Sequence, residues 1–158
     1  MKRRYRFALV PLARLKGHEQ IEPAVVEALV AELTETGVLK DPIWVARGSG
    51  VILNGHHRVA ALRRLKAARV PAWVIEYEAP DVRLDRWTPG PELDKAEVVR
   101  RARTGELFPP KTTRHRLDEP PPSRAVPLDR LLRPGRPRRQ RRPSRPSRSG
   151  VAGASGAR

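Results

Sequence analysis

The sequence predicts a compact α/β (α+β) domain with a small mixed sheet and flanking helices, followed by a disordered basic tail. Short apolar runs alternate with stretches in which apolar residues recur at helical spacing, in the order β-α-β-β-α-β. Glycines and prolines separate these segments, as is typical of turns and element ends. The pattern ends near residue 80 of the 158 residues, and arginine and proline dominate the last part of the chain.

The first part of the chain has clear boundaries between its expected elements. Pro23 suits the first position of a helix, and Gly37 is placed to end that helix. A Gly-Ser-Gly turn at residues 48–50 joins two short apolar runs and predicts a hairpin. Pro71 suits an edge strand or the start of a strand. The assignment is strands at 5–10, 43–46, 51–53 and 70–77, and helices at 23–36 and 56–66.

The chain after residue 80 is expected to be less regular. A short helix is predicted at 94–104, with Asp94 as its N-cap and Gly105 as its stop. The remaining segments are a loop at 81–93, an irregular stretch rich in anion-binding groups at 107–115, and a short apolar island at 126–132.

The positive charge is concentrated at the end of the chain. The formal net charge is +16, of which residues 130–158 contribute +10 through ten arginines and no acid, whereas residues 1–129 carry +6. Residues 133–158 consist almost wholly of Arg, Pro, Ser, Gly and Ala. Such a segment buries too little apolar surface to offset its ordering entropy, so we expect disorder. The 130–158 tail is a candidate for non-specific nucleic-acid binding.

The sequence lacks cysteine and lacks any long apolar run, and each absence excludes a class of protein. The chain has no cysteine, which excludes disulfides, thiolate metal sites and cysteine nucleophiles. No apolar run approaches the ~20 residues needed to span a bilayer, so no membrane partner is expected. The basic start is followed by a short apolar run that Pro11 interrupts. A signal peptide is therefore not expected, and the default is a cytoplasmic protein.

Polar chemistry gathers where the third expected strand turns into the next helix. Asn54 ends the strand, Gly55 turns the chain, and His56, His57 and Arg58 open the helix. A helix start exposes unpaired N–H groups and favours negative charge, and a guanidinium can hold phosphate through two hydrogen bonds. The motif predicts a phosphate site. An ordinary strand–turn–helix with a polar first turn is the alternative, because a single glycine turn is weak evidence.

All four histidines lie in polar stretches of the sequence. They are His18, His56, His57 and His115. As a set, with their charged neighbours, they suggest that three distant loops meet in one site, although each alone is compatible with a solvated loop residue. A zinc site is a poor alternative, since adjacent histidines at a helix start cannot easily offer both rings to one metal. The spacing also matches no usual zinc pattern, so no metal ligand is assigned.

Two further stretches and one tryptophan supply candidate site residues. Glu19 lies beside His18 in a loop, where a carboxylate can act as a general base; a surface glutamate is the alternative. The residues from Lys111 to His115 offer cations and hydroxyls that suit a carboxylate or phosphate, or form one more basic loop. Trp87 can close a small pocket or be a half-buried packing residue.

Three segments together resemble the ParB/sulfiredoxin superfamily, and more narrowly the ParB-like free L-serine kinases. They occur in the family's order and cover most of residues 5–117. The segments are Gly17-His18-Glu19, Ile52-Leu53-Asn54-Gly55-His56-His57-Arg58 and Phe108-Pro109-Pro110-Lys111-Thr112-Thr113-Arg114-His115. The last is the most specific, since the wider superfamily does not share it. Sulfiredoxin activity itself is excluded, because that reaction needs a cysteine where this chain has His56.

The resemblance implies phosphoryl transfer from ATP or ADP to the hydroxyl of free L-serine, giving O-phospho-L-serine, with Mg²⁺ as helper. It implies Glu19 as the catalytic base, with His57 as a second catalytic residue. The nucleotide phosphates would be held by Asn54, Gly55, His56, His57 and Arg58. The serine or phosphoserine pocket would be lined by Trp87, Lys111, Thr113, Arg114 and His115. Phosphoryl transfer requires positioning and charge neutralisation rather than covalent chemistry, which suits this set.

The resemblance also suggests how roles divide along the chain. Residues 1–80 would be the nucleotide-binding core, residues 81–132 a substrate-site extension that contains the Lys111–His115 loop, and residues 133–158 the tail.

Two departures from the family's pattern keep other readings open. The family usually has aspartate where this chain has Asn54, and asparagine cannot be a base and is a weaker Mg²⁺ ligand. The stretch between Trp87 and Lys111 is also shorter than in the full-length kinases. One alternative is a ParB-like nucleotide- or DNA-binding regulator without kinase activity, which the basic tail supports, although no convincing helix-turn-helix follows the core. The other is a degenerate, inactive domain.

Overall fold

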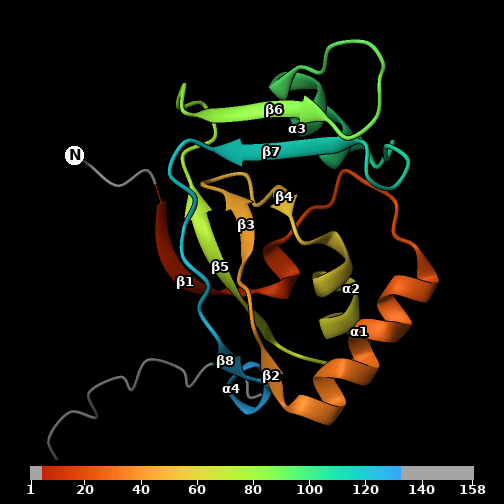
Figure 1. The fold of residues 1–158 in the computed structure, drawn as a ribbon, viewed down its shortest axis with the longest axis vertical. Coiled ribbons are helices and arrows are strands. Elements are labelled where there is room, and N and C mark those ends of the chain that lie inside the picture. Colours follow the sequence, from red (N-terminus) through yellow and green to blue (C-terminus); the bar gives the residue numbers. More distant parts are fainter. Residues whose placement is uncertain (1–4, 133–158) are drawn as a thin grey trace, which may run out of the picture.

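The computed structural model describes residues 5–132 of the chain. Figure 1 shows a main sheet with helices beside it, and a separate pair of strands with a further helix across one end. The mixed α/β class expected from the sequence is confirmed. The disorder expected for residues 133–158 lies outside the described residues.

The main sheet has the strand order β1-β5-β3-β4. The edge strand β1 (Tyr5–Pro11) pairs antiparallel with β5 (Arg69–Ile75). A short 3₁₀ turn, η1 (Leu12–Arg14), follows β1 directly. On its other side β5 pairs in parallel with β3 (Ile43–Ala46), and β3 pairs antiparallel with β4 (Ile52–Asn54). The predicted hairpin is thereby confirmed. β5 is buried along most of its length, so the middle of this sheet forms the core.

Pro71 does not lie where the sequence suggested. It lies inside the central strand β5 rather than at an edge or a strand start. On one side it pairs with Leu9 of β1, but β3 pairs with β5 only from Ala72 onward. On the β3 side, the strand has no partner at Pro71, so the lack of an N–H there removes no hydrogen bond to β3.

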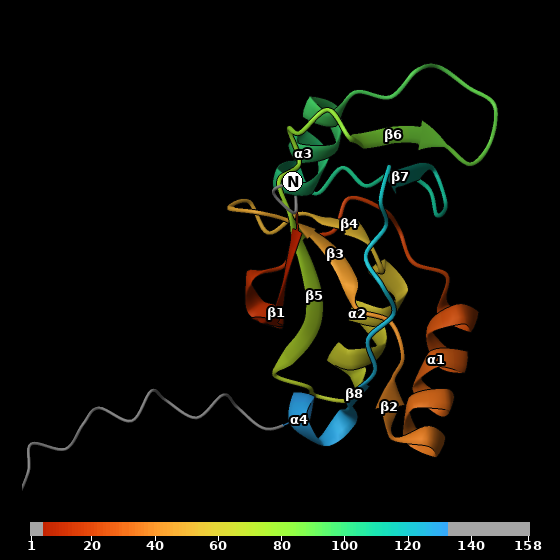
Figure 2. The same ribbon diagram turned by 60° about the vertical axis from the view of Figure 1, so that its left-hand side comes forward.

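Two helices lie on the same side of the main sheet (Figure 2). The first, α1 (Pro23–Thr36), has Pro23 at its start and ends at Gly37 in the left-handed conformation, both as predicted. The second, α2 (His56–Arg64), begins directly after Gly55. Apolar side chains of both helices join those of the sheet in one core cluster; from the helices these include Val26, Leu33, Val59 and Leu62.

A second layer lies across one end of the main sheet (Figure 1). It consists of an antiparallel pair, β6 (Val82–Arg86) with β7 (Thr113–Leu117), and of α3 (Lys95–Thr104). The helix confirms the prediction, since the Asp94 side chain caps it through a 2.9 Å bond from Ala96 N and Gly105 follows its end.

The two strands of this layer correct the sequence analysis. A loop was expected at 81–93, where β6 lies, and an irregular segment at 107–115, where β7 begins. The physical reason is that β7 buries polar side chains: Thr113 and His115 face inward with Leu117, whereas the residues between them are exposed. Hydropathy alternation therefore gives no strand signal there.

The chain then returns to the main core. β8 (Val126–Pro127) pairs with β2 (Val38–Leu39), and α4 (Leu128–Leu132) follows it directly. Val126 and Leu131 are buried in the cluster that holds the helices and the sheet. Residues on both sides of position 80 thus share one core. The division of residues 1–80 and 81–132 into a nucleotide-binding part and a substrate-binding part stays a prediction.

Candidate active site

Two backbone bridges hold the segment that carries Glu19. At the start of this segment, Lys16 O accepts a hydrogen bond from Ile52 N at 2.9 Å, beside β4. Two residues later, His18 O accepts one from Phe108 N at 2.8 Å. The segment therefore lies between the end of the main sheet and the residues that precede β7, which are distant in sequence.

The Glu19 carboxylate is bound to the first residue of β7. Its Oε1 accepts hydrogen bonds from the Thr113 N–H at 2.6 Å and from the Thr113 hydroxyl at 2.5 Å. The Glu19 side chain is 10% exposed, so one strand orients a carboxylate that still reaches the surface. Such a group suits a general base.

Three of the four histidines form a cluster beside Glu19. The His18 ring is fully buried, and its centroid lies 4.5 Å from that of His56 and 5.8 Å from that of His115. His56 Nε2 accepts the backbone N–H of His18 at 3.1 Å, and His115 Nε2 lies 2.8 Å from the Tyr77 hydroxyl. The cluster joins the Glu19 segment, the start of α2 and β7.

Burial makes these three rings neutral. It lowers the pKa of His18 to about 4 and that of His115 to about 3. Burial, and after it the charge of the neighbouring histidines, lowers the pKa of His56 well below its ordinary value. Near pH 7 the cluster therefore supplies hydrogen-bonding groups and no positive charge. Any role of His56 toward a phosphate, or of His115 toward serine, is that of a neutral ring.

His57 links the start of α2 to the start of α1. Its Nε2 accepts a hydrogen bond from the backbone N–H of Glu22 at 2.9 Å, directly before α1. The ring is half-buried, so it differs from the buried cluster next to it.

The start of α2 is shaped for an anion. Gly55 has φ 113°, and a Cβ added there would lie 2.4 Å from Ile43 Cγ2, so the backbone approaches β3 as closely as glycine allows. No side chain caps the helix, and its first turn contains no acidic residue. The first N–H groups of α2 are thus available to a negatively charged ligand.

Asn54 and Arg58 line a pocket beside this helix start. Arg58 Nη1 donates to the backbone oxygens of Asp41 at 2.8 Å and Pro42 at 2.9 Å, and Nη2 donates to Asn54 Oδ1 at 3.4 Å. The guanidinium therefore holds the turn before β3 in this structure. The pocket has a volume of about 400 Å³, and its lining includes Leu29, Val38, Asp41, Trp44, Asn54 and Arg58.

The two faces of β7 separate the expected substrate residues. Thr113 and His115 face inward, toward Glu19 and the histidine cluster, whereas Arg114 faces outward. The Arg114 guanidinium lies over the Trp87 ring, 4.7 Å from its centre, and the ring is 57% exposed. Lys111 is exposed, with φ 55°, in the turn before β7.

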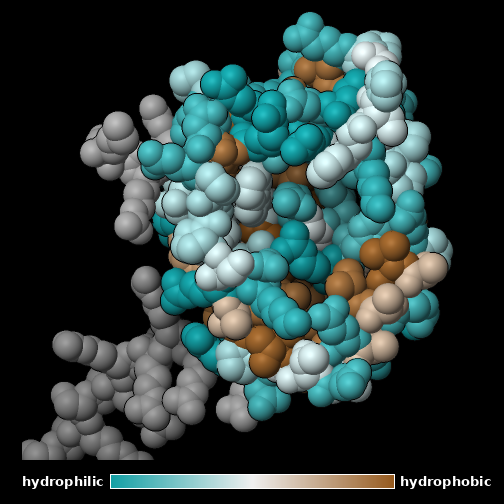
Figure 3. Space-filling model, viewed as in Figure 1, coloured by the Kyte–Doolittle hydropathy of each residue, from teal (hydrophilic) through white to brown (hydrophobic). Residues whose placement is uncertain are grey.

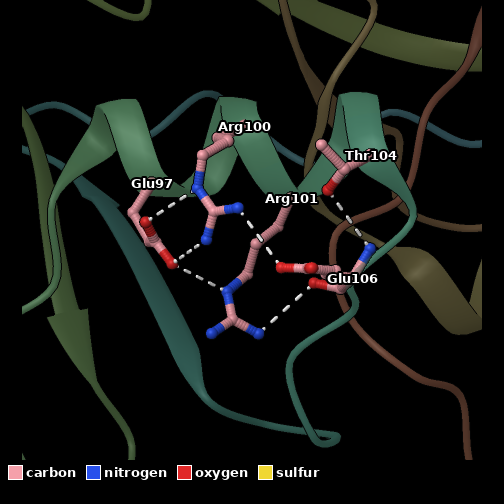
Figure 4. A network of polar contacts seen from close by, with 5 residues as sticks. All are labelled: Glu97, Arg100, Arg101, Thr104 and Glu106. Carbon is pink, nitrogen blue, oxygen red and sulfur yellow. Dashed lines mark hydrogen bonds and ion pairs between the residues drawn. The ribbon is translucent and has the colours of Figure 1, made fainter.

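A network on α3 supports the segment that precedes β7 (Figure 4). Glu97 accepts hydrogen bonds from Arg100 and Arg101, and Arg101 Nη1 donates to Glu106 O at 3.3 Å. The Arg101 guanidinium also lies 3.9 Å from the centre of the Phe108 ring. The Phe108 backbone N–H donates to His18 O, and Phe108 O accepts from Gln20 N. The contact of Arg101 with Phe108 therefore supports the segment that carries Glu19.

The structure brings the three predicted loops together. One connected group of contacts contains Glu19, Thr113, His56, His115 and His18, to which the sequence assigned no role. Asn54 and Arg58 face the neighbouring pocket. Trp87 lies with Arg114 on the outer face of β7. A further residue of the site is Tyr77, whose pKa is raised by burial. It lies in the turn after β5, and nothing in the sequence around it indicates that its hydroxyl meets a histidine.

Two kinds of site are absent from residues 5–132. No group of three or more histidine, cysteine, aspartate or glutamate side chains is arranged to hold a metal ion. None of the helices in this part of the chain combines the length and the apolar character needed to cross a membrane.

Three curated proteins similar to the chain are named L-serine kinases. It is 33% identical over 99 residues to the ADP-dependent L-serine kinase of Thermococcus kodakarensis, which covers 60% of this chain and 41% of the relative. It is 34% identical over 85 residues to the ATP-dependent L-serine kinase of Staphylothermus marinus, covering 51% and 34%. The chain thus spans less than half of these relatives. A ParB-like protein of Sulfolobus acidocaldarius is 31% identical over 83 residues. No protein-family model matches the chain.

Solved structures decide the architecture. Free serine kinase in complex with AMP superposes with a TM-score of 0.71 at 21% identity, over 83% of this chain and 95% of that one. The chain has the free serine kinase fold. A variant of free serine kinase in complex with ADP gives the same TM-score. A C-terminally truncated SbnI of Staphylococcus aureus superposes on this chain less closely, with a TM-score of 0.64 at 16% identity. The resemblance to ParB-like free L-serine kinases is confirmed.

Proposed function

We propose that this chain transfers a phosphoryl group from ATP or ADP to the hydroxyl of free L-serine. The observation that carries the proposal is the pair of hydrogen bonds from Thr113 to the Glu19 carboxylate. These bonds join two of the segments on which the kinase resemblance rests. The names of the curated relatives, L-serine kinases that use ADP or ATP, support the same reaction.

Glu19 is the proposed base. Its carboxylate accepts the proton of the serine hydroxyl as the serine oxygen bonds to the terminal phosphorus of the nucleotide. The bond between that phosphorus and the bridging oxygen breaks, and the nucleotide leaves with one phosphate fewer. Thr113 keeps the carboxylate oriented throughout. The half-buried His57, at the start of α2, bonds the backbone of Glu22, three residues after Glu19.

The nucleotide is expected at the start of α2. The uncapped N–H groups there, with no acid in the first turn, suit its phosphates. The pocket beside Asn54 and Arg58 has room for the nucleoside. Turning Arg58 toward a phosphate would require it to leave the backbone oxygens of Asp41 and Pro42.

Mg²⁺ belongs to the proposal as a helper of the nucleotide. This ion is commonly held by one or two protein oxygens together with the substrate phosphates, and it neutralises charge on them. Asn54 offers an exposed amide oxygen beside the Gly55 turn, which fits such an ion when the phosphates supply most of its ligands.

Serine is expected between Glu19 and the residues around the start of β7. Lys111 is an exposed cation in the turn before that strand. Arg114, which stacks on Trp87 on the outer face of β7, would have to reach around the strand end to meet the same ligand. These groups suit the carboxylate of serine or the phosphate of the product.

The test is nucleotide consumption that depends on L-serine. The full chain is incubated with Mg²⁺ and ATP or ADP, with L-serine in one arm and L-alanine, which lacks the acceptor hydroxyl, in the other. Consumption with L-serine alone is expected for this chain. Glu19→Gln is expected to remove it, whereas Glu35→Gln, the same change at an exposed position of α1, is expected to preserve it. Equal consumption with both amino acids would contradict the proposal.

A second function rests on the charge of residues 130–158. Ten arginines without an acid suit non-specific binding to nucleic-acid phosphates, which weakens as salt is raised. Affinity for DNA that falls steeply with salt, and that is mostly lost when the chain stops at Leu132, which keeps the buried Leu131, is the expected result. Tight, salt-independent binding by residues 1–132 would contradict it.

A further inference from the structure

A line of polar groups leads from Glu19 into the buried histidine cluster. The Thr113 hydroxyl oxygen lies 2.5 Å from Glu19 Oε1 and 2.7 Å from His18 Nε2. A threonine hydroxyl donates one hydrogen bond and accepts others, so it can bond both neighbours at once. The carboxylate is therefore linked to His18 through the hydroxyl, although His18 Nε2 and Glu19 Oε1 are themselves 3.9 Å apart.

His18 has little freedom to move. Its side chain is fully buried, and the rings of His56, His115 and Phe108 meet it edge to face. Its backbone N–H donates to His56 Nε2, and its carbonyl accepts from Phe108 N. A ring held on every side fixes the position of the hydroxyl that it contacts.

The second bond changes what Glu19 can do. With the Thr113 N–H alone as donor, the carboxylate could turn about its last side-chain torsion, which has broad energy wells. Two donors on the same oxygen, one of them fixed by a buried ring, restrict that rotation. The other oxygen is then held in one direction, and a fixed direction is what the deprotonation of a bound hydroxyl requires.

We propose that His18 and Thr113 act as positioning residues for Glu19, with the His18 ring fixing the Thr113 hydroxyl and the hydroxyl fixing the carboxylate. The kinetic test rests on the proposed kinase function, whereas the hydrogen-bond chain can be tested without turnover.

The first test removes the hydroxyl and keeps the backbone donor. Thr113→Val is expected to lower kcat by about tenfold or more, because small misplacements of a catalytic group are costly, with the KM for nucleotide unchanged. Thr113→Ser, which restores a hydroxyl, is expected to recover most of the loss. Thr112→Val is the matched control, since the hydroxyl of this buried neighbour donates to Pro109 O at 2.7 Å instead. Equal kcat values for Thr113→Val and Thr112→Val would overturn the proposal.

The second test asks whether both residues act through one chain. His18→Leu is expected to lower kcat as much as Thr113→Val, and the double variant to fall no further, since coupled residues are not additive. His18→Gln, which can donate or accept near the position of Nε2, is expected to recover part of the activity. Additive losses, or no difference between the leucine and glutamine variants, would overturn the proposal.

The third test needs no reaction. The Thr113 backbone nitrogen lies 2.6 Å from Glu19 Oε1, so its amide proton takes part in a short hydrogen bond to a carboxylate. This proton is expected at unusually low field in NMR spectra of the full chain. Glu19→Gln should move it upfield; His18→Leu should move it the same way, and His18→Gln less. An unmoved resonance in folded His18→Leu protein overturns the positioning role. If the resonance responds as expected and no phosphoserine forms, only the proposed function fails.

Discussion

The Glu19 carboxylate and the Thr113 hydroxyl lie 2.5 Å apart although 94 positions separate the two residues in sequence. The contact joins the loop before α1 to the layer of β6, β7 and α3 above the main sheet. Figure 3, in the view of Figure 1, shows a largely hydrophilic surface over that upper layer, with apolar side chains gathered lower down. Polar groups thus gather around the layer that carries the proposed substrate residues.

Gly55→Ala is expected to destabilise the fold strongly. The new methyl group would meet Ile43 Cγ2 at 2.4 Å, and the residue has φ 113°. Left-handed backbone costs about 1–2 kcal/mol for a non-glycine residue, and overpacking typically adds about 1–3 kcal/mol. Gly48→Ala isolates the first cost, because Gly48 also has positive φ but faces open space. Urea unfolding measures both; equal losses in the free energy of unfolding would contradict the close approach to β3.

The free energy of unfolding is expected to fall as pH drops below about 6.5. Burial lowers the pKa of folded His18 to about 4 and of folded His115 to about 3, against 6.5 in the unfolded chain. At pH values between the folded and the unfolded pKa, the unfolded chain binds more protons than the folded one. The contribution of the two neutral rings to the free energy of unfolding is therefore fully present above pH 6.5 and is lost as the pH falls toward the folded pKa. For His18 alone the decline is about 3 kcal/mol.

His18→Gln supplies the control for this pH dependence. Its unfolding free energy, measured by urea titration at several pH values, should decline less between pH 6.5 and pH 4 than that of the original chain. Parallel curves would show that His18 is not held neutral by burial.

Asn54→Asp is expected to increase phosphoryl transfer several-fold. A carboxylate would replace the exposed amide at the end of β4, restore the residue that the kinase family usually has, and bind Mg²⁺ more strongly. The Mg²⁺ concentration for half-maximal activity should fall, as measured by initial rates across a Mg²⁺ titration. Asn54→Ala is the comparison: if both variants behave alike, oxygen donation at this position does not matter.

Arg114→Ala is expected to raise the KM for serine about tenfold, the size of one lost charge-assisted hydrogen bond. The guanidinium stacks on Trp87 near the start of β7, where an anionic group of serine is proposed to bind. Arg83→Ala is the matched control, because Arg83 is exposed on β6 and pairs with Asp118 at 2.8 Å. Steady-state kinetics with varied serine compare the two; an equal rise in KM would indicate only a general effect of charge.

The sequence predicted those parts of the fold that depend on local signals. Pro23, Gly37, Asp94 and Gly105 mark helix ends that the structure reproduces, and the turn at 48–50 marks the hairpin. β7 could not be predicted in this way, because its buried positions carry threonine and histidine, which hydropathy counts as polar.

The candidate site was predictable in outline only. The resemblance named the three segments, and the structure brings them into contact. No sequence pattern indicated that Thr113 and Arg114 would face opposite sides of one strand, or that His18 would be fully buried. Both features follow from the pairing of β7 with β6 and from the packing of this layer on the main sheet, which are long-range effects.

Phosphorus NMR of the full chain with L-serine, Mg²⁺ and ATP or ADP follows the proposed reaction itself. We expect a growing O-phospho-L-serine resonance with matching loss of the terminal nucleotide phosphate, and no such resonance with Glu19→Gln. Spectra that show only intact nucleotide with both donors, from correctly folded protein, would contradict it.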